Sequence, residues 1–289
     1  MKTITLLISF ILLCGTLLNS QTKPGISVEE IMAVLCGEQE ISEGYRLVSR
    51  YSADERARTR EYLRNILKDL GIEALEHEYQ SQKAYMHGVN IYGILPATVK
   101  TEETIVLGAH YDSVPLCPGA NDNASGIAII IDILSKLMTL DHRTLNLMIV
   151  FFDQEETGRL GSKNFAKFLQ DKNAKIHSVH TVDQMGWDED KDRVVELELP
   201  DRYLEQIYSS LAHDLNIKVL VTDVESSDHQ SFRSSGIRSI GLTEEFVNGD
   251  TTPYYHSGKD TFATIDFGFM RSSSLLIYSV LEWLLEGNK

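Results

Sequence analysis

Side chains that can bind a metal ion or transfer a proton gather at a few separate points of this sequence. They are His110, Asp112, Asp122, Glu155, Glu156, Asp183 and His256. Imidazole nitrogens and carboxylate oxygens together form the donor set that suits zinc. A single residue of this kind after a strand is explained by a helix cap or a solvated loop, but this many are not. The residue types therefore predict a metal centre, with zinc as the expected ion.

Three expected strands contain or precede most of these residues. They span residues 104–110, 145–152 and 176–183, and the first two are apolar segments that are expected to be buried. His110 ends the first segment, Asp183 ends the third, and the pair Glu155 and Glu156 follows the second. Ligands of open α/β sheets bind just beyond the carboxyl ends of the strands. We therefore expect these side chains to meet at one edge of a sheet.

The rest of the chain alternates between expected helices and strands. The helices are expected at residues 53–70, 124–140, 163–170, 203–215 and 266–286. Further strands are expected at residues 73–79, 89–95 and 237–242. This alternation indicates an α/β fold with a largely parallel sheet covered on both faces. It also places Asp122 at a helix start, where an aspartate is equally expected as an N-cap.

Length and composition describe an ordinary globular protein. At roughly 100–200 residues per domain, the 289 residues allow one large domain or two small ones. Hydrophobic residues make up 43% of the chain and charged residues 24%, and the net charge is −15. A nucleic-acid partner requires a basic surface, and so does an anionic membrane, so neither is expected.

The first 20 residues are expected to be a signal peptide, with residues 21–289 forming one α/β domain. Lys2 precedes a mostly apolar stretch at residues 4–18, which the polar residues Asn19, Ser20 and Gln21 end. We expect cleavage near Ser20 and a secreted or periplasmic protein; a membrane or lipid anchor is the less favoured alternative. Removal of this segment leaves Cys36 and Cys117, which either pair in an oxidising compartment or remain buried thiols.

Five pieces of the sequence together resemble a known family. They are HYDS at residues 110–113, GANDNASG at 119–126, EETGRLGS at 155–162, Asp183, and YYHSGKDT at 254–261. In order and spacing they are similar to the zinc aminopeptidases of family M28. The resemblance extends from Leu47 to the C-terminal helix. It implies an α/β three-layer sandwich with a mixed, mostly parallel sheet and helices on both faces, the zinc-dependent exopeptidase fold.

The resemblance also implies two Zn²⁺ ions per chain that share one carboxylate, that of Asp122. Glu156 and His256 would complete one of the two sites. His110 and Asp183 would complete the other. A carboxylate has two oxygens, which suits it to bridging two metal ions about 3.5–4 Å apart.

Three further residues receive catalytic or supporting roles. By resemblance Glu155 is the general base, which takes a proton from the metal-activated water and passes it to the leaving amine. Asp112 is expected to accept the second ring N–H of His110, as carboxylates beside metal-binding histidines commonly do. Tyr255 either hydrogen-bonds the developing oxyanion, as a tyrosine does in some relatives, or simply packs there.

The implied reaction is hydrolysis of the first peptide bond of peptides with a free N-terminus. Gln184 stands where relatives often carry an apolar residue, and residues 226–237 resemble the stretch near the specificity pocket, so the preferred side chain stays open. Three alternatives also remain. A glutaminyl cyclase of the same fold would carry tryptophan at position 255; a carboxypeptidase would need Arg159, Arg233 or Arg238 to bind a carboxylate; a non-catalytic binding domain would have lost ligands.

Overall fold

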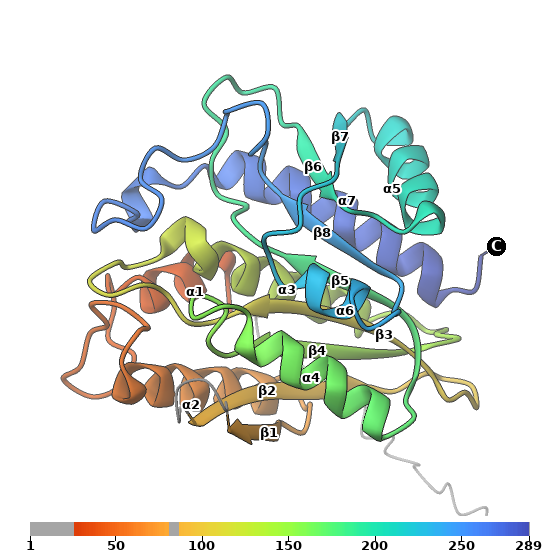
Figure 1. The fold of residues 1–289 in the computed structure, drawn as a ribbon, viewed down its shortest axis with the longest axis horizontal. Helices are drawn as coiled ribbons and strands as arrows, with labels where there is room; N and C mark the ends of the chain where they lie inside the picture. Colours follow the sequence, from red (N-terminus) through yellow and green to blue (C-terminus); the bar gives the residue numbers. More distant parts are fainter. Residues whose placement is uncertain (1–25, 81–86, 289) are drawn as a thin grey trace, which may run out of the picture.

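The computed structural model describes residues 26–80 and 87–288, so the signal segment expected at residues 1–20 lies outside them. Within the described residues an eight-stranded mixed sheet has helices on both faces, which confirms the predicted α/β sandwich (Figure 1). The strands are β1 (Leu75–Gln80), β2 (His87–Leu95), β3 (Glu103–His110), β4 (Asn146–Phe152), β5 (Lys175–Val182), β6 (Val195–Glu198), β7 (Val219–Thr222) and β8 (Ser239–Thr243). The helices are α1 (Val28–Leu35), α2 (Ala53–Asp69), α3 (Ser125–Leu137), α4 (Leu160–Asp171), α5 (Arg202–Asp214), α6 (His229–Arg233) and α7 (Phe267–Leu285).

The strand order is β1-β2-β4-β3-β5-β8-β6-β7. β3 lies between β4 and β5 and runs parallel to both, and β8 continues this parallel set beside β5. β2 is antiparallel to β4, and β6 is antiparallel to β8. The carboxyl ends of β4, β3 and β5 therefore meet at the same edge of the sheet, as the sequence predicted.

Alternation along the central strands divides the core into two layers. In β4, Leu147, Ile149 and Phe151 belong to the larger cluster, with α1, α2, α3, α5 and α7. The intervening residues of β4 pack against α4 and α6 on the opposite face. Side chains of a strand point alternately to its two faces, so a strand covered on both sides is apolar throughout.

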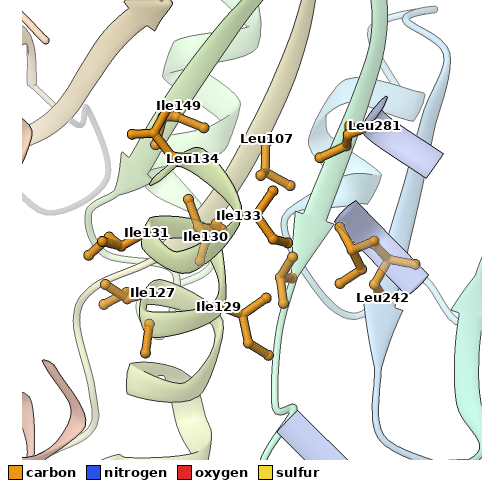
Figure 2. Close-up of a cluster of buried hydrophobic side chains, with 14 of the residues drawn as sticks. Leu107, Ile127, Ile129, Ile130, Ile131, Ile133, Leu134, Ile149, Leu242 and Leu281 are labelled. Atoms are coloured by element: carbon orange, nitrogen blue, oxygen red, sulfur yellow. The ribbon is translucent and has the colours of Figure 1, made fainter. Parts of the chain in front are cut away.

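Helix α3 is the centre of the larger layer. Its sequence SGIAIIIDILSKL is apolar on nearly every side, and its isoleucines face β3, β4, β8 and α7 (Figure 2). Asp132 and Lys136 form an ion pair on its one exposed side, and the other sides are apolar and buried. This packing fixes the N-terminal end of α3, which directly follows the turn that carries Asp122.

The structure corrects two parts of the sequence-based interpretation. α3 begins at Ser125, and Asp122 has non-helical backbone angles of φ −111° and ψ 89°, so the N-cap interpretation of Asp122 was wrong. The elements α1, α6, β6 and β7 were not predicted. Cys36 and Cys117 are buried free thiols, and none of the described helices combines the length and apolarity that a membrane span requires.

The buried Arg50 connects the N-terminal segment to the loop between β3 and α3 by hydrogen bonds. Arg50 is 0% exposed. Its guanidinium donates hydrogen bonds to four backbone carbonyls, those of Leu35, Tyr111, Pro118 and Gly119. Three of these carbonyls lie between His110 and Asp122, so the arginine fixes the course of the chain between the two residues.

Replacing this arginine should therefore destabilise the protein strongly. In Arg50→Met the free energy of unfolding should fall by about 3–4 kcal/mol, because each buried carbonyl that loses its donor costs about 1 kcal/mol or more. Urea denaturation followed by circular dichroism measures the change. Arg271→Met is the matched control: Arg271 is 68% exposed and lies 3.5 Å from Glu29, and an exposed ion pair contributes about 1 kcal/mol at most. Equal, small losses in both variants would contradict the role of Arg50.

Candidate metal centre

The predicted metal-binding residues converge from five segments of the chain. His110 is the last residue of β3, Glu156 follows β4, and Asp183 follows β5. Asp122 comes from the turn before α3, and His256 from the loop between β8 and α7. Three of the five residues thus end or follow parallel strands, and the other two lie in a turn and a loop.

The first group of donor atoms surrounds His110. Its Nε2 lies 3.1 Å from Asp122 Oδ1 and 3.3 Å from Asp183 Oδ1. His110, Asp122 and Asp183 are all buried, with exposures of 1%, 4% and 8%. These three ligand atoms lie close enough together to hold one ion.

The second group surrounds His256. Its Nε2 lies 2.9 Å from Glu156 Oε2 and 3.3 Å from Asp122 Oδ2. The backbone of His256 is in the left-handed region, at φ 53°. Asp122 therefore directs one oxygen to each histidine and is common to both groups. This is the arrangement of a carboxylate that bridges two metal ions.

The electrostatics of the two groups fit cations better than they fit the protein alone. Hydrogen bonds with Asp122 and Glu156 raise the pKa of His256 to about 10. Burial, together with the nearby Asp122 carboxylate, raises the pKa of Glu156 to about 7. Glu156 Oε1 is also buried without a hydrogen-bond partner among the described residues. Carboxylates that are buried together without a cation cost free energy, and divalent ions would remove that cost.

Asp112 supports this site in two ways, one of them unexpected. His110 Nδ1 lies 3.2 Å from the backbone carbonyl of Asp112 and 3.4 Å from its carboxylate, so the carbonyl is the closer acceptor. The carboxylate accepts the backbone N–H groups of Glu155 and Glu156, at 2.9 Å and 3.2 Å. Asp112 thereby fixes both the imidazole and the turn that carries the two glutamates.

Glu155 and Tyr255 line a cavity of about 110 Å³ together with Asp122 and Asp183. Glu155 belongs to neither group of metal-type donors. Burial raises the pKa of Glu155 well above its usual range. The ring of Tyr255 stacks on His256 at a centroid distance of 3.7 Å, and the residue is 47% exposed. Tyr255 therefore both packs and faces the cavity.

Sequence reasoning missed two buried acids that hold this site from behind. Asp260 is 0% exposed and accepts the backbone N–H groups of Asn121 at 2.8 Å and Asp122 at 3.1 Å. Glu244 accepts hydrogen bonds from the Asn121 side chain and the Trp187 backbone. Glu244 directly follows β8, so the rule that identified the other strand ends also applied here. Asp260 lay within the segment YYHSGKDT, but its role depends on a contact across the fold.

The support from Asp260 can be tested by removing one acceptor oxygen. Asp260→Asn keeps the shape of the side chain but accepts one backbone N–H instead of two. Zinc affinity, measured by competition with a chromophoric chelator, should fall about 10–100-fold, the usual effect of losing an outer partner of a metal ligand. Glu55→Gln is the control, because Glu55 also accepts two backbone N–H groups, from Ser49 and Ser52, and belongs to no group of metal-type donors among the described residues. Equal affinities in the two variants would refute the role of Asp260.

Comparisons with known proteins identify relatives of this chain. The model of peptidase family M28 matches residues 90–281. Aminopeptidase YwaD of Bacillus subtilis is 31% identical over 187 residues, which are 61% of this chain and 40% of that protein. The chain spans about half the length of the curated relatives it matches.

Two solved structures show the same fold. The zinc aminopeptidase BSAP of Bacillus subtilis superposes with a TM-score of 0.65 and 23% identity, covering 71% of this chain and 52% of its own. The glutaminyl cyclase of Porphyromonas gingivalis superposes with a TM-score of 0.74 and 18% identity, covering 90% of this chain and 99% of its own. The family match covers all five metal-type ligands, from His110 to His256, and most of the sheet. The chain therefore belongs to peptidase family M28.

Proposed function

We propose that this protein is a zinc-dependent aminopeptidase that hydrolyses the N-terminal peptide bond of peptides and binds two zinc ions per chain. One observation carries the proposal: two groups of three donors share Asp122, and Glu155 stands beside them in the same cavity without belonging to either group. Zinc is favoured by the mixed imidazole and carboxylate donors. The aminopeptidase names of the relatives support the choice of reaction.

The protein residues divide the work of such a reaction. Glu156 and His256 would hold one ion, His110 and Asp183 the other, and Asp122 both. When bound, the ions would polarise the substrate carbonyl and acidify a water molecule.

Two further residues would take part directly. Glu155 accepts a proton at its carboxylate and delivers it to the departing amine, while Asp112 keeps the backbone of Glu155 in place. The Tyr255 hydroxyl donates a hydrogen bond to the substrate oxygen.

The charges of the cavity favour recognition of an amine over recognition of a carboxylate. Its lining residues include several acids and no lysine or arginine among the described residues. Arg233 and Arg238 both lie against Asp201, at 3.8 Å and 3.2 Å. Arg159 donates to the backbone carbonyl of Glu225. None of the three lines the cavity, which argues against the carboxypeptidase alternative.

The glutaminyl cyclase alternative is favoured by one observation, the close match in length to the cyclase from Porphyromonas gingivalis. Tyr255 in place of tryptophan and the complete five-residue donor set favour the aminopeptidase.

We also propose that residues 1–20 direct export and are removed, so that the mature enzyme acts outside the cytoplasm.

A paired assay separates the two activities. The zinc-loaded protein should release the chromophore from aminoacyl anilides and should not release ammonia from peptides with N-terminal glutamine. Chelation by a strong zinc ligand should abolish the anilide activity, and added zinc should restore it. Ammonia release without anilide hydrolysis would establish the cyclase instead, and the absence of both would favour a binding domain.

The two adjacent glutamates should respond differently to the same substitution. Glutamine matches glutamate in size but takes up no proton at neutral pH. In Glu155→Gln both metals should remain bound while kcat falls by about 10²–10⁴-fold, the usual contribution of a general base. In Glu156→Gln metal affinity should fall, and excess zinc should partly restore activity. Metal analysis with steady-state kinetics checks both variants; near-normal kcat in Glu155→Gln would show that the roles are wrongly assigned.

A further inference from the structure

The cavity that contains Glu155 and Tyr255 has a polar part, which we call the recess. Besides the residues already described, the recess is lined by Gln184, Glu198, Ser226, Ser227, Thr243 and Phe246. Only one of these six is apolar. The whole cavity, including the part beside the metal-type ligands, has a volume of about 110 Å³.

Glu198 is the one acid among these six residues. It is the last residue of β6, where it pairs with Gly241 of β8, and it is only 4% exposed. Its carboxyl group accepts no hydrogen bond from residues 26–80 or 87–288, although its Oε2 lies 3.4 Å from Nδ1 of His229. A largely buried acid that lines a cavity without a donor from the protein is a candidate for binding a ligand.

His229 does not neutralise Glu198. The His229 Nε2–H donates to the backbone carbonyl of Val224 at 2.9 Å. In the neutral imidazole the other nitrogen, Nδ1, is then an acceptor, and it has no hydrogen-bond partner. The glycine opposite Glu198 makes the close approach possible: a Cβ at Gly241 would lie 2.8 Å from Glu198 Oε2 and 2.5 Å from His229 Nδ1. The carboxylate is thus held in place without a proton donor.

A second acceptor without a partner lines the same recess. Gln184 directly follows Asp183, has a left-handed backbone at φ 48°, and its Oε1 is buried without a hydrogen bond. Glu198 and Gln184 together offer acceptor oxygens to a ligand that brings hydrogen-bond donors. A cationic group brings both donors and the missing counter-charge, and charge-assisted hydrogen bonds are the stronger kind.

We propose that Glu198 determines specificity, with Gln184, by binding the cationic side chain of an N-terminal lysine or arginine. The proposal rests on the aminopeptidase function: the first peptide bond lies at the metal centre, so the side chain of the first residue extends into the adjoining recess. Glu198 then pairs with the ammonium or guanidinium group, and the Gln184 oxygen accepts a second hydrogen bond.

Lysine and norleucine provide a direct test, because they differ only by the terminal ammonium group. In the zinc-loaded wild type, kcat/KM should be at least tenfold higher for the lysyl anilide than for the norleucyl anilide. Glu198→Gln should lower this ratio about 10–100-fold, since a hydrogen bond to a charged group contributes about 1.5–3 kcal/mol, and the fall should come from the lysyl anilide. Glu198→Leu should reverse the preference.

Glu196→Gln is the matched control. Glu196 is a buried glutamate two residues earlier on β6, its carboxylate accepts hydrogen bonds from Thr222 and Val247, and it does not line the recess. This variant should keep the wild-type ratio. A wild type that does not prefer lysine, or a Glu198→Gln variant that slows all substrates equally, would overturn the proposal.

Binding separates this inference from the proposed reaction. Calorimetry with lysinol and norleucinol, which have no amide bond to hydrolyse, measures binding to the recess without turnover. Tighter binding of lysinol to the wild type than to Glu198→Gln, in a protein that hydrolyses no anilide, would support the recess while overturning the aminopeptidase function. Anilide hydrolysis with equal binding of the two amino alcohols would do the reverse.

Discussion

The site depends on the single carboxylate of Asp122, which faces two histidines at once. Its oxygens lie 3.1 Å from His110 Nε2 and 3.3 Å from His256 Nε2. This position is not the helix start that local sequence suggests. Asp260 holds the backbone N–H of Asp122, Arg50 fixes the chain before it, and the buried helix α3 anchors the chain after it. The rest of the fold can be understood as support for this one group.

Sequence patterns predicted the parts of the site that lie at strand ends. β3 and β4 are largely apolar on both faces, so their limits can be read from the sequence, and His110 and the two glutamates end or follow these strands. β6 escaped prediction because its sequence VELE is half charged, although all four residues are buried. Glu196 accepts hydrogen bonds from Thr222 of β7 and from Val247 in the loop after β8, and Glu198 pairs with Gly241 of β8. No local sequence pattern encodes contacts between segments so far apart in the chain. The support from Asp260 was missed for the same reason.

The strands beyond β5 bring Glu198 to the same cavity as the metal-type ligands. β8 continues the parallel set, and β6 then reverses direction beside it. Glu198 is thereby placed next to Asp183 in the cavity while remaining outside the donor groups. His110, Glu156 and Asp183 thus end or follow the central strands, whereas Glu198 ends β6, two strands beyond β5.

Metal stoichiometry tests the shared role of Asp122 most directly. Zinc bound per chain can be measured by equilibrium titration and elemental analysis in wild type, Asp122→Ala and Asp183→Ala. If Asp122 bridges two ions, the wild type should saturate at two zinc ions, Asp183→Ala should weaken one site, and Asp122→Ala should weaken both. A wild type that saturates at one ion, or an Asp122→Ala variant that keeps one site at full affinity, would contradict the bridging arrangement.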